Sequence, residues 1–297
     1  MMRDLATASA ALLGLAFGSF LNVCVSRWPK GESIVQPRSH CMSCGRLLAW
    51  WENLPLASWI ALKGRCRTCD SRIGWRYPLA ELAVGTLWAL AAWQALGSAL
   101  PAVEAALPSA ALVTLAGSLT FYWLLVALAA LDAEHFWLPD MLTLTGIAAG
   151  FLFTVADGML DSGLPGAHWT DAALHGAGSA ALHSLLATVC AAALMGFIRW
   201  TYRLARKREG MGLGDVKLMA LLGAWLGFSG ALLALVLGVS LGALAAVILL
   251  ILAAGKGNKE TIWLQKLPLG TFLCVGGAIS GLFGREIIAA YLRLVGL

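Results

Sequence analysis

The segment REGMGLGDVKLMALLGAW, residues 208–225, places glycines and charged residues together at the beginning of a long apolar run. Charged side chains near a bilayer are costly, and glycine weakens a helix. A chain that retains such residues at the edge of an apolar segment needs a physical reason for them. The residues in question are Gly210, Gly212, Gly214, Asp215 and Lys217.

The composition surrounding this segment is that of an integral membrane protein. The 297 residues are 60% hydrophobic and only 12% charged, whereas soluble domains have about 25% charged residues. The first apolar run, from about Leu5 to Val25, is long enough to span a bilayer. It lacks a small-residue cleavage site followed by a polar mature chain, so we do not expect a removed signal peptide. Further apolar runs lie near 79–98, 110–131, 138–156, 178–198, 216–228, 231–254 and 267–284.

The sixth and seventh of these eight runs meet at FSG, residues 228–230, where we expect a tight hairpin. The sequence therefore predicts an all-α polytopic protein with about eight transmembrane helices. We expect three parts: a first transmembrane helix at 1–26, a cytoplasmic loop at 27–77 and a seven-helix core at 78–297.

The distribution of basic residues predicts the orientation. Of the 21 Lys and Arg, nine lie between Arg27 and Arg76, six between Arg199 and Lys217, and three between Lys256 and Lys266. The alternate loops, 99–109 and 157–177, contain none. The positive-inside rule places the basic segments in the cytoplasm and both termini outside, although two basic residues in the C-terminal tail weigh slightly against this. The net charge of +5 then reflects orientation in the bilayer, and we expect no nucleic-acid partner.

The loop 27–77 contains two C-x-x-C motifs, CMSC at 41–44 and CRTC at 66–69. Two such motifs separated by 21 residues resemble a structural zinc site with four thiolate ligands, although the spacer is one residue longer than the usual range. Disulfides are the alternative, but they do not persist in a reducing cytoplasm. Redox catalysis is a further alternative, and two motifs together favour a closed metal site instead. The predicted ligands are Cys41, Cys44, Cys66 and Cys69.

Other cysteines and the aromatic residues of the loop have simpler interpretations. Three cysteines within apolar spans are expected to be small buried side chains; they are Cys24, Cys190 and Cys274. The tryptophans of the loop indicate an interfacial belt and a small packed core, with a substrate groove as the alternative; they are Trp50, Trp51, Trp59 and Trp75.

Two aspartates are predicted to share the cytoplasmic side of the membrane. The third span ends in LLVALAALDAEHFWLPD, which includes Asp132 and Asp140, and two further spans return the chain to the same face before Asp215. Asp140 follows a proline and opens the fourth span, where a carboxylate is stabilised by the helix dipole. Asp132 lies at the C-terminal end of an apolar helix, where the dipole is unfavourable, so we interpret it as functional.

Two neighbouring carboxylates in a low-dielectric site can share one proton, so that one activates a water and the other protonates a carbonyl oxygen. Asp132 and Asp215 are therefore the candidate catalytic pair. Gly212 and Gly214 would let the backbone bend and let a peptide or a second helix approach Asp215. Lys217 would either orient or neutralise charge, or only mark the interface.

GMGLGDVKL resembles the G-x-G-D signature of intramembrane aspartyl proteases, and nearly the whole chain resembles the bifunctional type IV prepilin peptidases. The matching stretches are GSFLNVCVSRWP at 18–29, the tetracysteine segment at 38–82, LDAEHFWLPDMLTL at 131–144 and LPLGTFLCVGG at 267–277. Val216 is a mild departure, because an aromatic residue is common after the second aspartate of the family.

The resemblance implies that the protein cleaves the leader of type IV prepilins and type II secretion pseudopilins, after a glycine, at the cytoplasmic face of a bacterial inner membrane. It also implies methylation of the new N-terminal amine by S-adenosylmethionine. The family's catalytic pair falls on Asp132 and Asp215, and its zinc ligands fall on the four cysteines. The sequence contains no G-x-G-x-x-G after a strand, so we assign no residue to the methyl donor.

Two alternatives remain at this stage. An ion-coupled transporter would also use intramembrane carboxylates and glycine-broken helices. A membrane scaffold whose zinc loop docks a partner would explain the cysteines but leaves Asp132 and GLGD unexplained.

Overall fold

The computed structural model describes residues 2–99, 109–160, 176–207, 212–254 and 267–296. Within these residues the chain is helical apart from turns, loops and two isolated β-bridges. The helices are α1 (Met2–Arg27), α2 (Ala57–Ala61), α3 (Arg76–Ala99), α4 (Ser109–His135), α5 (Asp140–Leu160), α6 (Ala177–Arg206), α7 (Leu213–Ala254) and α8 (Leu269–Val295), with short 3-10 turns η1 (Trp28–Lys30) and η2 (Trp50–Asn53).

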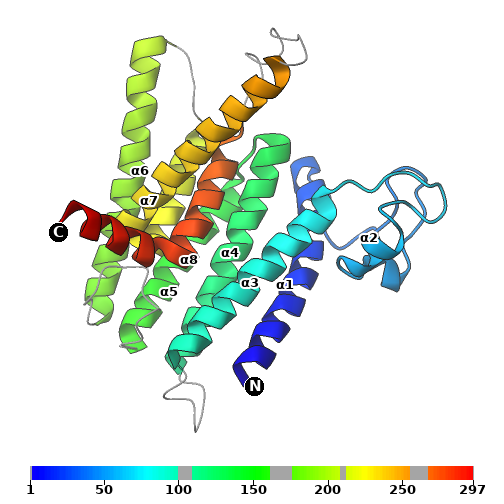
Figure 1. The fold of residues 1–297 in the computed structure, drawn as a ribbon, viewed down its shortest axis with the longest axis horizontal. Coiled ribbons are helices and arrows are strands. Elements are labelled where there is room, and N and C mark those ends of the chain that lie inside the picture. Colours follow the sequence, from blue (N-terminus) through cyan, green and yellow to red (C-terminus); the bar gives the residue numbers. More distant parts are fainter. Residues whose placement is uncertain (1, 100–108, 161–175, 208–211, 255–266, 297) are drawn as a thin grey trace.

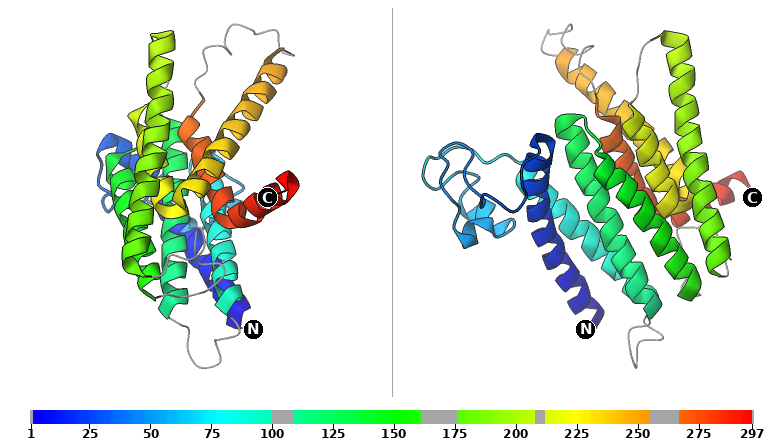
Figure 2. Two further views of the ribbon diagram at one scale, coloured as in Figure 1. Left: turned by 90° about the vertical axis from the view of Figure 1, so that its left-hand side faces the viewer. Right: turned by 180° about the vertical axis from the view of Figure 1, so that it is seen from behind.

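Seven of the described helices are long and apolar enough to cross a membrane. These are α1 and α3 to α8, and they form one bundle (Figure 1). One end of the bundle contains the last turns of α1, α4 and α6 and the first turns of α3, α5, α7 and α8 (Figures 1 and 2). The segment 28–75, called the cysteine loop below, joins α1 to α3 at that end and lies beside α1, outside the bundle (Figure 1).

α7 reverses its direction in the middle, which explains why seven helices are found where the sequence predicts about eight. At Gly227 the backbone has φ 70° and ψ 177°, outside the helical region. After Gly227 the chain runs antiparallel to α8. Two contacts show this direction: Ser280 Oγ donates to the Gly230 carbonyl at 2.8 Å, and the later residue Gly238 packs against the earlier residue Leu273.

Before Gly227 the chain runs parallel to α8. Gly214 and Gly270 both pack against the side chain of Leu138, and further along the chain Leu222 packs against Gly277. The two limbs of α7 are therefore the predicted sixth and seventh spans, joined as expected by a tight turn, which lies one residue before FSG. The first limb has about 14 residues and a length of about 21 Å, less than the ~30 Å hydrocarbon thickness of a bilayer.

Close approach of backbones holds α1 against α3. The α1 sequence GLAFG, residues 14–18, is a small-xxx-small motif. A Cβ on Gly14 would lie 2.9 Å from Gly85 Cα, and a Cβ on Gly18 would lie 2.6 Å from Glu81 Cα. Because lipid offers no hydrophobic force between helices, such contacts stabilise the bundle through van der Waals packing.

Candidate active site and four-cysteine centre

Asp132 lies in the last turn of α4 and reaches the first turn of α8. Its side chain is almost buried, with 6% of the residue exposed. Its Oδ2 atom accepts hydrogen bonds from the backbone N–H of Thr271 at 2.7 Å and from the Thr271 hydroxyl at 3.2 Å. The same hydroxyl lies 3.0 Å from the Ala129 carbonyl of α4. Asp132 thus faces the positive end of the α8 dipole, which offsets the unfavourable dipole of its own helix.

Asp215 lies in the first turn of α7, as the sequence predicts. Only 9% of the residue is exposed. Its Oδ2 atom accepts a hydrogen bond from the backbone N–H of Gly212 at 3.3 Å. A carboxylate at this position is stabilised by the α7 dipole and by an N–H group that the helix leaves free.

The structure brings Asp132 and Asp215 together. The side chain of Leu138 contacts Gly214, next to Asp215, and also Gly270, which lies against the Asp132 carboxyl group. The two aspartates are close enough for the charge of Asp132 to act on Asp215. They come from different helices and are 83 residues apart in sequence, so only the fold makes them a pair.

The other charged residues near this end form pairs of their own. Asp140, the first residue of α5, pairs with Lys217 of α7, and its side chain remains 63% exposed. Lys217 therefore neutralises charge, but on Asp140 and not on the buried pair. Glu134, two residues after Asp132, pairs with Arg76 at the beginning of α3.

Of the two glycines beside Asp215, only Gly214 makes a close contact. Neither Gly212 nor Gly214 has a positive φ, so neither is required here for a left-handed bend. Gly214 lies so close to Leu138 that a Cβ would sit 3.1 Å from that side chain. Leu138 belongs to the turn between α4 and α5, so this contact is with neither the peptide nor the second helix that the sequence predicts. Gly210, also singled out in the sequence, lies outside the described residues.

Sequence reasoning missed Thr271. LPLGTF quoted at 267–272 places a proline and then a threonine at the beginning of an apolar helix, which is a signal for a polar helix start. Its role as the partner of Asp132 could not be found from the sequence, because the two residues are 139 positions apart.

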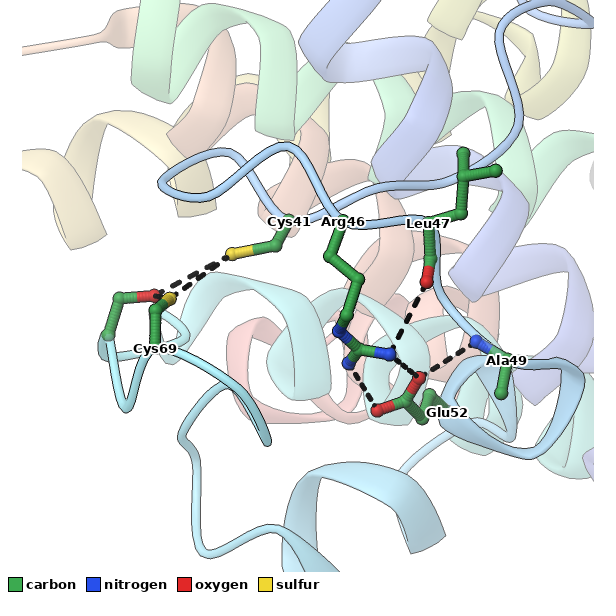
Figure 3. Close-up of polar contacts among 7 residues, drawn as sticks. Cys41, Arg46, Leu47, Ala49, Glu52 and Cys69 are labelled. Carbon is green, nitrogen blue, oxygen red and sulfur yellow. Dashed lines mark hydrogen bonds and ion pairs between the residues drawn. The ribbon is translucent and has the colours of Figure 1, made fainter.

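The four predicted cysteine ligands form one cluster. The sulfur atoms of Cys41, Cys44, Cys66 and Cys69 all lie within 4.8 Å of one another. Zn–S bonds of about 2.3 Å in a tetrahedron require sulfur separations of about 3.8 Å, and Cys41 Sγ and Cys69 Sγ are 3.8 Å apart (Figure 3). The set is thus chemically and geometrically suited to a tetrahedral ion that prefers thiolates.

The two C-x-x-C segments fold alike. In the first, Gly45 N–H donates to the Cys41 carbonyl, and in the second Asp70 N–H donates to the Cys66 carbonyl. Gly45 and Asp70 both have a positive φ, of 71° and 56°. Each segment is therefore a tight knuckle that turns both of its sulfur atoms toward the other knuckle.

Backbone N–H groups favour the thiolate at the first cysteine of each knuckle. The Cys44 N–H lowers the pKa of Cys41 to about 6, and the Cys69 N–H lowers the pKa of Cys66 below its ordinary value. At Cys44 the Arg46 N–H also favours the anion, but desolvation and the neighbouring sulfur atoms outweigh it and raise the pKa to about 11. The proximity of the other sulfur atoms thus opposes ionisation of Cys44.

An ion pair between the half-buried Arg46 and the buried Glu52 supports the first knuckle. Glu52 accepts two hydrogen bonds from the Arg46 guanidinium, at 3.0 and 2.7 Å, and one from the Ala49 N–H at 2.7 Å (Figure 3). The Arg46 guanidinium, with help from the Ala49 N–H, holds the pKa of Glu52 below its usual value. The bidentate pair fixes the backbone that follows Cys44.

The remaining cysteines and tryptophans agree in part with the predictions. Cys24 and Cys274 are buried as expected, but Cys190 is exposed on α6, which corrects its interpretation. Trp59 and Trp75 pack with ring centroids 4.3 Å apart, but Trp75 and Trp50 are 74% and 75% exposed, so the tryptophans of the loop do not form the packed core that the sequence predicts.

Together these features define a polytopic membrane protein with a buried pair of carboxylates and a four-cysteine loop at one end of its helical bundle. Residues 12–95 match the Bacterial Peptidase A24 N-terminal domain, and residues 119–248 match the Type IV leader peptidase family. The similarity extends over nearly the full chain in named relatives, and the chain belongs to the type IV prepilin leader peptidase family.

Several curated proteins called Prepilin leader peptidase/N-methyltransferase are similar to the chain. The protein of Burkholderia pseudomallei (strain 1026b) is 36% identical over 97% of this chain and 88% of its own length. That of Pseudomonas aeruginosa is 32% identical over 96% and 93%, and that of Myxococcus xanthus (strain DK1622) is 38% identical over 87% and 67%. No solved structure shows significant similarity to the chain.

Proposed function

We propose that this protein removes the leader peptide of prepilins and pseudopilins and then N-methylates the new N-terminal residue. The observation that carries the proposal is the pair of nearly buried carboxylates, Asp132 and Asp215, brought together where α4 ends and α7 begins. The relatives' names supply the substrate class and the second activity.

In the proposed cleavage, Asp132 and Asp215 share one proton. The ionised carboxylate takes a proton from a water molecule, whose oxygen attacks the scissile carbonyl, and the protonated carboxyl donates its proton to the carbonyl oxygen. Collapse of the tetrahedral intermediate returns a proton to the leaving amine and breaks the C–N bond. Thr271 holds Oδ2 of Asp132, which fixes the orientation of the carboxyl group toward the substrate.

We infer that the cysteine loop binds one zinc ion through Cys41, Cys44, Cys66 and Cys69. Zinc would supply a structural cross-link between the two knuckles, with no open coordination position for a substrate. Arg46 and Glu52 would hold the first knuckle in the geometry that binds the ion.

We assign methyl transfer to the neighbourhood of the same loop. S-adenosylmethionine would supply the methyl group, and the amine released by cleavage would attack it, lose a proton and leave S-adenosylhomocysteine. The loop is the one extensive polar segment of the sequence, and it joins the bundle at the end that contains Asp132 and Asp215 (Figure 1).

From the basic residues of the loop and of the end of α6 we infer that this end of the bundle faces the cytoplasm. The protein would then be a multi-pass protein of the bacterial inner membrane, bounded by lipid and with its active site facing the cytoplasm. The parts expected at 1–26, 27–77 and 78–297 would be the first helix, the zinc loop and the protease core.

The cleavage proposal is tested by coexpressing a prepilin and following leader removal by its mobility shift and by mass spectrometry. Asp132→Asn and Asp215→Asn should each lower the cleavage rate by at least about 10²-fold, the usual loss when a general acid or base is removed. Asp140→Asn is the matched control, because Asp140 lies at the same end but is paired with Lys217 and exposed. Normal cleavage by both Asp132→Asn and Asp215→Asn would contradict their assignment as the catalytic pair and favour the transporter alternative. Loss of cleavage only in Asp140→Asn would do the same.

The loop proposal is tested by replacing Cys66 and Cys69 together with Ser. Wild-type protein should contain about one zinc per chain, and the double variant should contain none. Methylation of the mature N-terminus should be impaired at least as strongly as cleavage. Full methylation by a zinc-free double variant would show that the loop does not serve this step.

A further inference from the structure

Three buried polar side chains of the transmembrane helices hold the cysteine loop and its junction with α3 in place. In the last turns of α1, Arg27 donates to the carbonyls of Ser33 and Pro37 at 2.9 and 2.6 Å. Nearby, Asn22 donates to the Tyr77 carbonyl at 3.0 Å, where the loop enters α3. Glu81, one turn further along α3, accepts a hydrogen bond from the Leu56 N–H at 2.8 Å.

Glu81 is the contact that holds the middle of the loop. Glu81 is a buried carboxylate within a helix of membrane-spanning length. An ionisable side chain is energetically costly there, so we interpret it as functional. Its partner Leu56 has φ 56° and ψ −48°, a backbone conformation that is costly for a non-glycine residue. The hydrogen bond across to α3 offsets that cost and fixes where α2 begins.

The position of α2 is passed on to the second cysteine knuckle. Trp59 of α2 donates from Nε1 to the Ile73 carbonyl at 3.3 Å. The same ring lies against Gly64, where a Cβ would approach it to 2.9 Å. Gly64 and Ile73 flank the knuckle of Cys66 and Cys69, and the Ile73 N–H donates to the Gly64 carbonyl at 2.7 Å. A continuous set of contacts therefore runs from Glu81 to the knuckle.

The peptidase pair is held by other contacts. Asp132 is bound by Thr271 of α8, and Asp215 is bound by Gly212. Glu81 belongs to α3, and its partners are Leu56 of the loop and Ser19 of α1, so its removal should leave these contacts in place.

We propose that Glu81 is a positioning residue for methyl transfer, which fixes the place of α2 and of the second cysteine knuckle against the bundle and is not required for peptide cleavage. This inference rests on the proposed function, in which the loop serves methyl transfer. Methyl transfer needs the new amine and the methyl donor aligned within a fraction of an ångström, and a misplacement of about 1 Å can cost about 10²-fold in rate.

The decisive variant is Glu81→Met, which keeps the length of the side chain and removes the carboxylate acceptor. Glu81→Gln is the conservative variant, because its amide oxygen can still accept from Leu56 N–H. Gln94→Ala is the matched control: it removes a hydrogen bond of α3 to the Leu282 carbonyl at the other end of the helix. Each purified protein is assayed for zinc content, prepilin cleavage, N-terminal methylation and hydrogen exchange of the Leu56 amide.

In Glu81→Met we expect the Leu56 amide to exchange faster and methylation to slow by about tenfold or more, with zinc content and cleavage within about twofold of wild type. Glu81→Gln should restore most of the methylation, and Gln94→Ala should leave methylation and Leu56 exchange unchanged. Should Glu81→Met fail to accumulate, Glu81→Ala takes its place with the same expectations.

Normal methylation in Glu81→Met, or an equal loss of methylation and cleavage, would overturn the inference. The Cys66→Ser/Cys69→Ser variant separates this failure from failure of the proposed function. When that variant loses methylation and Glu81→Met does not, Glu81 alone has been misassigned. When the cysteine variant methylates normally, the proposed role of the loop has failed.

Discussion

Asp132 sits at the end of one helix and at the beginning of another, and this double position accounts for a carboxylate in an apolar environment. The dipole of α4 disfavours its negative charge, while the first turn of α8 supplies two hydrogen bonds and a favourable dipole. The Thr271 hydroxyl also lies within hydrogen-bonding distance of the Ala129 carbonyl. It therefore joins the two helices at the reactive group.

Thr271→Val should lower the cleavage rate by roughly tenfold or more, because a hydrogen bond to a charged group contributes about 1.5–3 kcal/mol. Valine keeps the branched shape and the backbone N–H bond, so the helix start should be preserved. Steady-state cleavage of a purified prepilin measures the effect, and Thr271→Ser should retain most of the activity. Equal rates for the valine variant and wild type would show that the hydroxyl does not orient Asp132.

Among the helices, α7 positions Asp215 beside Asp132. Its first limb is short, and Gly227 ends it with a backbone conformation that is open essentially to glycine alone. The first limb carries Asp215 beside α8, and the second limb returns antiparallel along the same helix. The turn at Gly227 therefore sets the depth at which the first limb lies.

Gly227→Ala should destabilise the protein by about 1–3 kcal/mol, because a Cβ is strained at this φ and ψ. We expect a lower thermal midpoint in detergent and lower accumulation in membranes. Gly196→Ala on α6 is the control, since Gly196 has open space around its Cα. Similar midpoints for the two variants would indicate that the chain turns elsewhere.

At the scale of the whole molecule, the cysteine loop and the carboxylate pair both belong to one end of the bundle (Figures 1 and 2). Arg76, where the loop enters α3, pairs with Glu134 two residues beyond Asp132, so the two regions are also joined directly. This arrangement is suited to a protein that performs two successive steps on one peptide end.

The proposed orientation predicts the behaviour of reporter fusions. Alkaline phosphatase fused after Ala99 should be active, because that end of α3 would lie outside the cytoplasm. Green fluorescent protein fused after Arg206 should fluoresce, because the basic end of α6 would lie inside. The reverse pattern would place the thiols in an oxidising compartment and contradict the zinc assignment.

The sequence by itself determined the membrane class, the number of helices apart from the turn at Gly227, the four clustered cysteines and the two candidate aspartates. These follow from local patterns: apolar length, the spacing of cysteines and charge at the end of an apolar run. The tertiary structure alone decided that Thr271 holds Asp132, that Lys217 neutralises Asp140 and that Glu81 holds Leu56. Each of these contacts joins residues from different elements, and their partners are set by how helices pack, which no local pattern encodes. The pairing of Asp132 with Asp215 depends on both the sequence and the tertiary structure. The order of the spans in the sequence placed both aspartates at one face, and the packing around Leu138 and Gly270 made them neighbours.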